Sequence, residues 1–150
     1  MDYLRPKAEA IEQDTSLPSA IICDLDGTLA LLNGRSPYDA STCENDILNE
    51  PVAEVLRSFD KTTIIFMSGR FDTHRAETER WLVHHGFHFQ LLYMRKAGDM
   101  RKDSTMKREL FDEHVRGKYF VRFVLDDRDS VVELWRSLGL TCFQVAEGNF

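Results

Sequence analysis

The 150 residues, of which 43% are hydrophobic, suit a single globular domain with one core and exclude a chain that is disordered over most of its length. A net charge of −6 excludes a broadly basic coat for nucleic acid, so any nucleic-acid site must be a local patch. No apolar run is long enough to cross a bilayer, and three cysteines without metal-ligand spacing indicate reduced thiols in a cytoplasmic setting.

Apolar runs alternate with helical patterns over residues 19–150, whereas residues 1–18 are charged and end in Thr15-Ser16-Leu17-Pro18. We expect residues 1–18 to form an N-terminal helix or tail outside the core. In chain order, the pattern then predicts a strand at 20–23, a helix beginning near Pro51, a strand at 62–67, a helix at 72–85, a strand at 87–93, a helix at 103–115, a strand at 120–125, a helix along the apolar stripe 131–138, and a strand at 140–145. Strands that alternate with helices predict an α/β fold, with a central parallel sheet flanked by helices.

Three of the predicted strands end in polar clusters, namely Asp24-Leu25-Asp26-Gly27-Thr28, Ser68-Gly69-Arg70 and Asp126-Asp127-Arg128. In open α/β sheets, ligands bind at the carboxyl ends of the strands, so we expect the three clusters to converge on one site. Four carboxylates at one site repel each other unless a hard cation lies among them, and oxygen ligands suit Mg²⁺. The sequence therefore predicts a magnesium site.

The order of these motifs, with Lys107 between the second and the third, resembles the haloacid dehalogenase superfamily of aspartate-based phosphohydrolases. The segment Asn33-Gly34-Arg35-Ser36-Pro37-Tyr38-Asp39 narrows the resemblance to the phosphatase half of bacteriophage polynucleotide kinase/3′-phosphatases. Segments 98–103 and 144–150 resemble that half as well. The resemblance covers residues 19–150, and it implies a Rossmann-like haloacid dehalogenase fold for this phosphatase domain.

Two carboxylates carry the expected chemistry. Asp24 ends a buried strand and is the expected nucleophile, which forms an aspartyl-phosphate that water then hydrolyses. Asp26 is the expected general acid and base, because a sugar alkoxide leaves poorly without a proton. The resemblance implies that Mg²⁺ is held by Asp24, by the backbone carbonyl of Asp26 and by Asp127.

The remaining site residues are assigned to phosphate binding or to support. Thr28, Ser68, Gly69 and Lys107 are expected to bind phosphate, and so are Arg35 and Arg70, which we expect to be exposed on loops. Asp103, Asp126 and Arg128 are expected to support the site. Asp103 has two compatible predicted roles, as the ion-pair partner of Lys107 and as a helix N-cap. The predicted role of Asp126 is ambiguous between binding the metal and supporting the structure.

Two features favour a nucleic-acid substrate. The segments from Asp26 to Ser68 and from Arg70 to Lys107 must already supply core elements, which leaves room for a small flap but for no large cap domain, so a polymer end can enter. Six basic residues gather within 14 positions, and they can follow a phosphate backbone: Arg95, Lys96, Arg101, Lys102, Lys107 and Arg108. The acidic region 39–54 offers no comparable contact.

The leading hypothesis is a polynucleotide 3′-phosphatase that removes 3′-phosphate from DNA or RNA ends in nucleic-acid end repair. The alternatives are a magnesium-dependent phosphatase of nucleotides or other small phosphoesters, and an end-binding module without turnover. The 150 residues contain no Gly-x-x-x-x-Gly-Lys-Ser/Thr loop, so ATP-dependent phosphorylation is not predicted. We expect a monomer in a bacterial or phage-infected cell, and the resemblance implies a kinase and a ligase as pathway partners.

Overall fold

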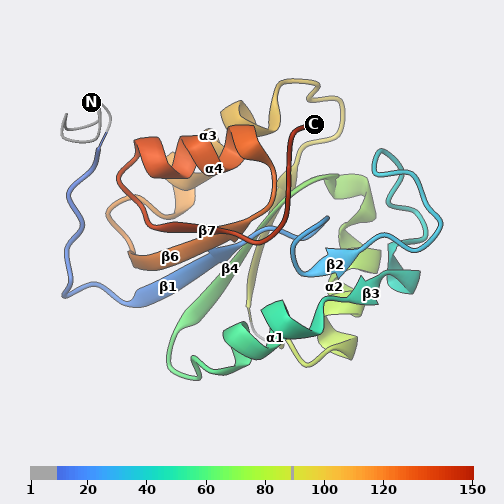
Figure 1. The fold of residues 1–150 in the computed structure, drawn as a ribbon, viewed down its shortest axis with the longest axis horizontal. Coiled ribbons are helices and arrows are strands. Elements are labelled where there is room, and N and C mark those ends of the chain that lie inside the picture. The colour runs from blue at the N-terminus through green and yellow to red at the C-terminus, as the bar shows by residue number, and fades with distance from the viewer. Residues whose placement is uncertain (1–9, 89) are drawn as a thin grey trace.

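The computed structural model describes residues 10–88 and 90–150, and its centre is a five-stranded parallel sheet (Figure 1). The strands are β1 (Ser19–Cys23), β4 (Thr63–Phe71), β5 (Leu91–Arg95), β6 (Phe120–Asp126) and β7 (Cys142–Gln144). They lie in the order β5-β4-β1-β6-β7, which places β1 in the middle of the sheet. This arrangement confirms the predicted α/β fold with a central parallel sheet.

Helices of the described part of the chain cover both faces of the sheet (Figure 1). They are α1 (Glu50–Arg57), α2 (Arg75–His84), α3 (Asp103–His114) and α4 (Asp129–Ser137). Because successive side chains of a strand point to opposite faces, Ile21 packs with α1 and α2, whereas Ile22 packs with α3 and α4. Both faces of β1 are therefore buried, which explains why its sequence is a continuous apolar run.

The chain reverses its direction of strand addition beside β1. It places β4 and then β5 on one side of β1, and it then returns to the other side for β6 and β7. Ligands of open α/β sheets bind outside the carboxyl ends of the strands at such a switch point. The ends of β1 and β6 are therefore the expected location of a site, and these ends carry Asp24 and Asp126.

The segment between β1 and α1 forms a small flap. Its strands β2 (Ala30–Leu31) and β3 (Ile47–Leu48) pair antiparallel, and the short 3₁₀ helix η1 (Cys43–Asn45) precedes β3. Asn49 ties the flap to the turn after β1, since its side-chain amide donates to the Thr28 carbonyl oxygen at 2.8 Å. No larger cap lies among the described residues, as predicted from the short gaps between the motifs.

Three boundaries differ from the predicted ones by three residues or more. The strand predicted at 87–93 begins only at Leu91, because Phe87 still donates its backbone N–H to Leu82 in the turn that ends α2. The helix predicted from residue 72 begins at Arg75, after the 3₁₀ turn η2 (Asp72–His74). Strand β4 continues to Phe71, so Ser68-Gly69-Arg70 lies within the last residues of the strand.

The predicted N-terminal helix or tail over 1–18 falls partly outside the described residues. Residues 10–18 contain no helix in the structure. Ile11 donates its backbone N–H to Leu138, and the Gln13 side chain both donates to and accepts from the Val121 backbone, so this segment lies against α4 and β6. Among the described helices, none combines the length and the apolar character that a membrane crossing requires.

The burial of β1 on both faces predicts a large cost for truncating it. We expect Ile22→Ala to lower the free energy of unfolding by about 2–5 kcal/mol, because the fully packed surroundings cannot close the cavity. Val83→Ala, on the outer surface of α2, is the matched control and should change it by less than about 0.5 kcal/mol. Urea denaturation measures both, and equal losses would contradict the packing described here.

Candidate active site

A tight turn directly after β1 holds Asp24 at the end of the sheet. The Asp24 N–H continues the parallel ladder by donating to the Leu125 carbonyl oxygen at 3.0 Å. The chain then reverses, because Thr28 and Ala30 both donate their backbone N–H to the Leu25 carbonyl oxygen. As a result, Asp24 stays on the rigid strand end, while Asp26 is displaced to the side by the turn.

Gly27 meets two requirements of this turn. Its φ of +82° lies in the left-handed region, where a side chain is strained. A Cβ atom at this position would also lie 2.2 Å from Oδ2 of Asp127, which is closer than any real contact. The glycine in the motif is therefore what allows the Asp127 carboxylate to approach the turn that carries Asp24.

Lys107 reaches from α3 into the centre of the site, where it is buried. Its Nζ donates to Oδ1 of Asp24 at 2.8 Å and to Oδ2 of Asp126 at 3.1 Å. Burial alone lowers the pKa of the ammonium group, but the Asp126 and Asp24 carboxylates outweigh it, so the pKa of Lys107 is raised above its ordinary value. Lys107 is therefore a fixed positive charge that bridges the ends of β1 and β6.

Two hydroxyl groups lie at the same edge of the sheet. Thr28 Oγ1 donates to Oδ2 of Asp24 at 3.0 Å and lies 3.4 Å from Oδ1 of Asp127. Ser68 lies two residues beyond Phe66, the β4 residue that pairs with Cys23 at the end of β1. The Ser68 hydroxyl oxygen accepts the Arg70 N–H at 3.1 Å, which leaves its own O–H to donate to a bound group.

Three buried carboxylates, those of Asp24, Asp126 and Asp127, each place an oxygen within 4.8 Å of the others. Burial raises the pKa of Asp24 well above its ordinary value, against the opposing effect of Lys107, and burial also raises the pKa of Asp127. One lysine does not balance three carboxylates, so the group favours a further positive charge.

The donor atoms of this group fit a hard cation. Both oxygens of Asp126 already accept hydrogen bonds, one from the backbone N–H groups of Asp127 and Arg128 and the other from Lys107 and Trp135. Asp24 and Asp127 therefore offer the more available lone pairs, in an all-oxygen set of the kind that Mg²⁺ or Ca²⁺ prefers. Asp26 was predicted to add its backbone carbonyl, and its side chain lies outside this group of three.

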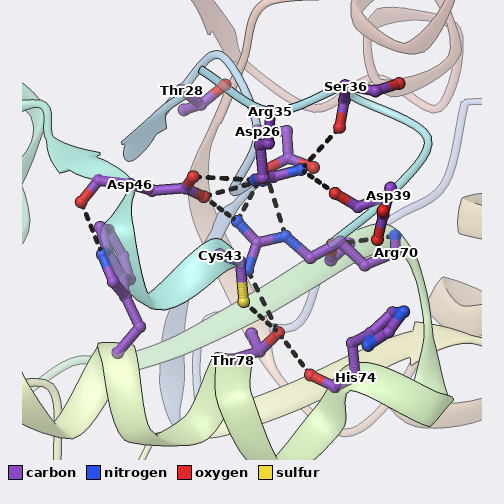
Figure 2. A network of polar contacts seen from close by, with 12 residues as sticks. Asp26, Thr28, Arg35, Ser36, Asp39, Cys43, Asp46, Arg70, His74 and Thr78 are labelled. Carbon is purple, nitrogen blue, oxygen red and sulfur yellow. Dashed lines mark hydrogen bonds and ion pairs between the residues drawn. The ribbon is translucent and has the colours of Figure 1, made fainter. Parts of the chain in front are cut away.

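Asp26 faces a separate network of charges, shown in Figure 2. Its Oδ1 accepts from Nη2 of Arg35 at 2.7 Å, and from Nη2 and Nε of Arg70 at 2.6 and 3.1 Å. The same two arginines bind Asp46, a residue of the flap. We call Asp26, Arg35, Asp46 and Arg70 the charge ring.

The sequence analysis did not identify Asp46 as a site residue, and it predicted that Arg35 and Arg70 would be exposed. Instead, the side chains of Arg35 and Arg70 are buried against the two carboxylates. Asp46 lies in the acidic region 39–54, where the surrounding charges made it look like part of a solvated surface. The only feature of the sequence that pointed to a further aspartate is the presence of two arginines in the site motifs, since two buried guanidinium groups need two carboxylates. This feature does not identify which aspartate provides the second carboxylate.

Asp103 joins a third network, at the start of α3. Its carboxylate pairs with Arg95 of β5 through one oxygen and with Nη1 of Arg128 at 2.8 Å through the other. A Cβ atom on Gly69 would come within 2.9 Å of the same carboxylate, so this glycine gives Asp103 its space. Asp103 thus connects the ends of β4, β5 and β6, and it contributes to Lys107 by raising the pKa of that side chain through its charge.

The predicted basic segment is not one exposed patch. Arg95 and Lys107 are buried, and Arg101 forms ion pairs with Asp99 and Glu109. Lys96 and Lys102 have no ion-pair partner among the described residues. Most of this local positive charge therefore stabilises the protein itself, because the segment forms the connection that brings α3 to the site.

The structure thus brings all twelve predicted site residues to the carboxyl end of the sheet, where three networks adjoin and Ser68 accepts the Arg70 N–H. Asp24, Thr28, Lys107, Asp126 and Asp127 form the first network, and it contains the three carboxylates that could hold a cation. Asp26, Arg35 and Arg70 form the charge ring with Asp46, while Asp103 and Arg128 form the third network with Arg95 and lie against Gly69. Two carboxylates in separate surroundings on one turn, one of them buried beside a lysine, form an arrangement that can transfer a phosphoryl group.

A family model described as the polynucleotide kinase PNKP phosphatase domain matches residues 18–150. A protein of Autographa californica nuclear polyhedrosis virus, described as a bifunctional polynucleotide kinase/RNA ligase, is 36% identical over 137 residues. These residues are 85% of this chain and 19% of the viral protein, so the chain spans about a fifth of that relative's length.

The solved structures that are similar to the chain include a component of an RNA repair complex and a domain of an effector protein. A chain of the Pnkp1/Rnl/Hen1 RNA repair complex is 52% identical, with a TM-score of 0.90 over 98% of this chain and 49% of that chain. The HAD domain of the effector protein Lem4 from Legionella pneumophila is 12% identical, with a TM-score of 0.55 over 89% of both chains. The second likeness shows the fold alone, and it confirms the haloacid dehalogenase fold predicted from the motifs.

The contact between Gly27 and Asp127 predicts a selective defect in cation binding. We expect Gly27→Ala to lower the free energy of unfolding by about 1–2 kcal/mol through its positive φ. We also expect magnesium chloride to raise the melting temperature of the wild type but not that of Gly27→Ala. The second effect arises because the new Cβ displaces the Asp127 carboxylate.

Gly34→Ala is the matched control, since Gly34 has a φ of +74° and nothing within 4 Å of an added Cβ. It should show a similar loss of stability and keep the response to magnesium. Thermal denaturation with and without the salt measures both variants. An unchanged magnesium response in Gly27→Ala would contradict the assignment of Asp127 to the cation site.

Proposed function

Because the chain belongs to the family of polynucleotide kinase PNKP phosphatase domains, a family of phosphoric monoester hydrolases, we propose that residues 19–150 remove 3′-phosphate from DNA or RNA ends in nucleic-acid end repair. The observation that carries this proposal is the contact set of Asp24. One oxygen of this buried carboxylate is held by Lys107 and the other by Thr28, at the switch point of the sheet. A carboxylate fixed in this way is oriented to attack, since its position is set before the substrate arrives.

In the first half of the reaction, an oxygen of Asp24 attacks the phosphorus atom. A bond forms between that oxygen and phosphorus, and the bond from phosphorus to the sugar oxygen breaks. The sugar oxygen takes a proton from Asp26, which makes it a better leaving group. The product of this half is an aspartyl-phosphate and a free 3′-hydroxyl end.

In the second half, a water molecule attacks the phosphorus atom of the aspartyl-phosphate. Asp26 now accepts the proton of that water, and the bond between phosphorus and the Asp24 oxygen breaks. Inorganic phosphate leaves, and Asp24 is regenerated as a carboxylate. Asp26 thus returns to its protonated state, ready for the next turnover.

Phosphate oxygens are proposed to bind to the hydroxyls of Thr28 and Ser68, to the backbone at Gly69 and to the ammonium group of Lys107. A Mg²⁺ ion bound by Asp24, Asp127 and the Asp26 carbonyl would neutralise negative charge on the transferred group. The fit of the three-carboxylate group to an oxygen-binding cation supports this assignment. Asp126 then serves mainly to hold Lys107.

The size of the flap favours a polymer end over a small metabolite. The short strands β2 and β3 and the loop between them are the only insertion between β1 and α1. We infer that a flap of this size does not enclose the substrate, so a chain of nucleotides can extend away from the site. Most basic residues of the segment 95–108 are buried or form ion pairs within the protein. We therefore expect fewer contacts to the phosphate backbone of a nucleic acid than the sequence of this segment suggests.

Assembly with other end-repair proteins is part of the proposal. The solved relative is a component of the Pnkp1/Rnl/Hen1 RNA repair complex. This observation on a relative runs counter to the monomer expected from the sequence, and it supports the expected connection with a kinase and a ligase. We therefore propose that this domain acts beside such partners.

The nucleophile assignment predicts the outcome of one substitution. With Mg²⁺, the wild type should release phosphate from a 3′-phosphorylated oligonucleotide and leave a 5′-phosphorylated one intact. Asp24→Asn should lower that release by about 10³-fold or more, because an amide cannot form the acyl-phosphate. Phosphate release measures this effect, and a variant that keeps its activity would exclude Asp24 as the nucleophile.

The polymer assignment predicts a preference between two substrates. We expect kcat/KM on a 3′-phosphorylated oligonucleotide to exceed that on a nucleoside 3′-monophosphate by about tenfold or more, since contacts to the additional nucleotides contribute binding energy. Both substrates present the same reacting group, so the ratio reports these contacts alone. Comparable efficiency would instead favour a phosphatase of small phosphoesters.

A further inference from the structure

The flap carries one aromatic side chain, that of Tyr38, and most of it faces solvent. Tyr38 lies between β2 and η1, and 88% of its surface is exposed. A ring with this exposure contributes little apolar burial to the folded state. Single exposed apolar residues are common on protein surfaces, so exposure alone assigns no role to Tyr38. What distinguishes this residue is the way in which its backbone is held.

A tight turn fixes the backbone of Tyr38. The Asp39 N–H donates to the Ser36 carbonyl oxygen at 3.2 Å, which closes a β-turn over Pro37 and Tyr38. Pro37 occupies the second position of this turn, where the restricted φ of proline is favourable. The Tyr38 N–H donates to the Ser36 hydroxyl oxygen at 3.1 Å. The ring of Tyr38 is therefore presented to solvent by a backbone that has little freedom to rearrange.

Arg35 connects this turn to Asp26 (Figure 2). Its Nη1 donates to the carbonyl oxygens of Ser36 at 3.2 Å and of Asp39 at 3.3 Å, which are the two ends of the turn. Its Nη2 donates to Oδ1 of Asp26 at 2.7 Å. A single planar guanidinium group thus joins the turn that carries Tyr38 to the carboxyl group that is proposed to transfer protons. Tyr38 therefore belongs to the edge of the site on the side of Asp26.

The terminal nucleoside of the substrate lies on this same side in the proposed reaction. Asp26 gives its proton to the sugar oxygen that leaves phosphorus, so this sugar must lie next to Asp26. The nucleobase is attached to the same sugar, and it must therefore lie near the edge of the site where the flap begins. The flap offers a base one aromatic surface, which is the ring of Tyr38.

The charges around Tyr38 favour a neutral group over a phosphate. Arg35 is the only basic residue from β2 to β3, and its guanidinium is already bound by carboxylate and carbonyl oxygens. Asp39, which follows Tyr38 directly, is exposed and would repel a phosphate. A nucleobase is uncharged, and its flat face can stack on an aromatic ring whatever the sequence.

We propose that the ring of Tyr38 stacks on the nucleobase of the 3′-terminal nucleotide and places the substrate end against Asp26. The proposal rests on the proposed function, because it uses the position of the leaving sugar. The rigid turn makes the stack favourable, since the protein loses little conformational freedom when the base binds. Tyr38 is thereby a specificity residue, which selects a nucleoside 3′-phosphate over a phosphoester that has no base.

A second exposed ring belongs to a different network. Phe150 is 70% exposed, and its ring centroid lies 4.7 Å from the guanidinium carbon of Arg128. Arg128 pairs with Asp103, so Phe150 adjoins the third network, whereas Tyr38 adjoins the charge ring. Phe150 is the alternative surface for a base, and the experiment tests it beside Tyr38.

Removal of the terminal base tests the stack directly. Two 3′-phosphorylated oligonucleotides are compared, one intact and one whose terminal sugar carries hydrogen in place of the base. For the wild type, we expect kcat/KM to be lower on the baseless substrate by about 5- to 100-fold, which is the range for one base stacked on an aromatic ring. Tyr38→Leu should lose the same factor on the intact substrate and change kcat/KM on the baseless one by less than about threefold.

Three further variants identify the group responsible. Tyr38→Phe keeps the ring and should retain kcat/KM on the intact substrate within about threefold, whereas a role of the hydroxyl group would be lost. Phe143→Leu is the matched control, because it removes an exposed ring of β7 that packs on Phe123. It should leave the ratio of the two substrates unchanged, and so should Phe150→Leu.

Three results would overturn the proposal. The wild type would use both substrates equally well, or Tyr38→Leu would lose activity equally on both, which indicates a structural role. In the third, the loss that depends on the base would appear in Phe150→Leu and not in Tyr38→Leu, which places the base beside Arg128.

The proposed function fails in a different way, namely if Asp24→Asn keeps its turnover. Binding to Asp24→Asn, measured by fluorescence anisotropy of labelled oligonucleotides, reports the stack without turnover. The intact oligonucleotide should bind more tightly than the baseless one, and adding Tyr38→Leu should remove this difference. Failure of the stack and failure of the reaction are therefore distinguishable.

Discussion

The structure depends on the way in which Lys107 holds carboxylates from two strands together. Asp24 ends β1 and Asp126 ends β6, and the lysine donates to both from the interior of α3. Without the ammonium group of Lys107, these carboxylates and Asp127 would repel each other. They lie at the switch point, where the order of strand addition reverses. The lysine offsets one of the three charges, and the rest of the negative charge is what makes the place suitable for a cation.

A second principle is the separation of two aspartates that are only two positions apart. The turn at Gly27 leaves Asp24 among the three buried carboxylates and moves Asp26 into the charge ring. The two side chains then have different surroundings, and this difference suits a nucleophile and a proton donor. Three backbone hydrogen bonds fix this turn from Leu25 to Ala30 and thereby create the difference.

Much of the positive charge near the site forms ion pairs within the protein and is therefore not free to bind a substrate. Arg35, Arg70 and Arg95 are committed to aspartates, and Arg128 is shared between Asp103 and the ring of Phe150. Buried guanidinium groups need such partners, because an unpaired charge is costly to remove from water. The acidic net charge and a phosphate-binding site are thus compatible, since each arginine near the site carries its own counter-charge.

The sequence alone determined the order of the elements and which polar clusters would gather at one edge of the sheet. Apolar runs bounded by turns predicted all five strands of the sheet, and carboxylates at strand ends predicted where the site would lie, because parallel strands bring their ends together. What only the tertiary structure decided is which charges pair. Asp46 enters the site from a flap 20 residues after Asp26, Asp103 binds Arg95 and Arg128, and Arg35 is buried. Such pairings depend on distances across elements that are remote in the chain, and a linear pattern of charges does not contain those distances.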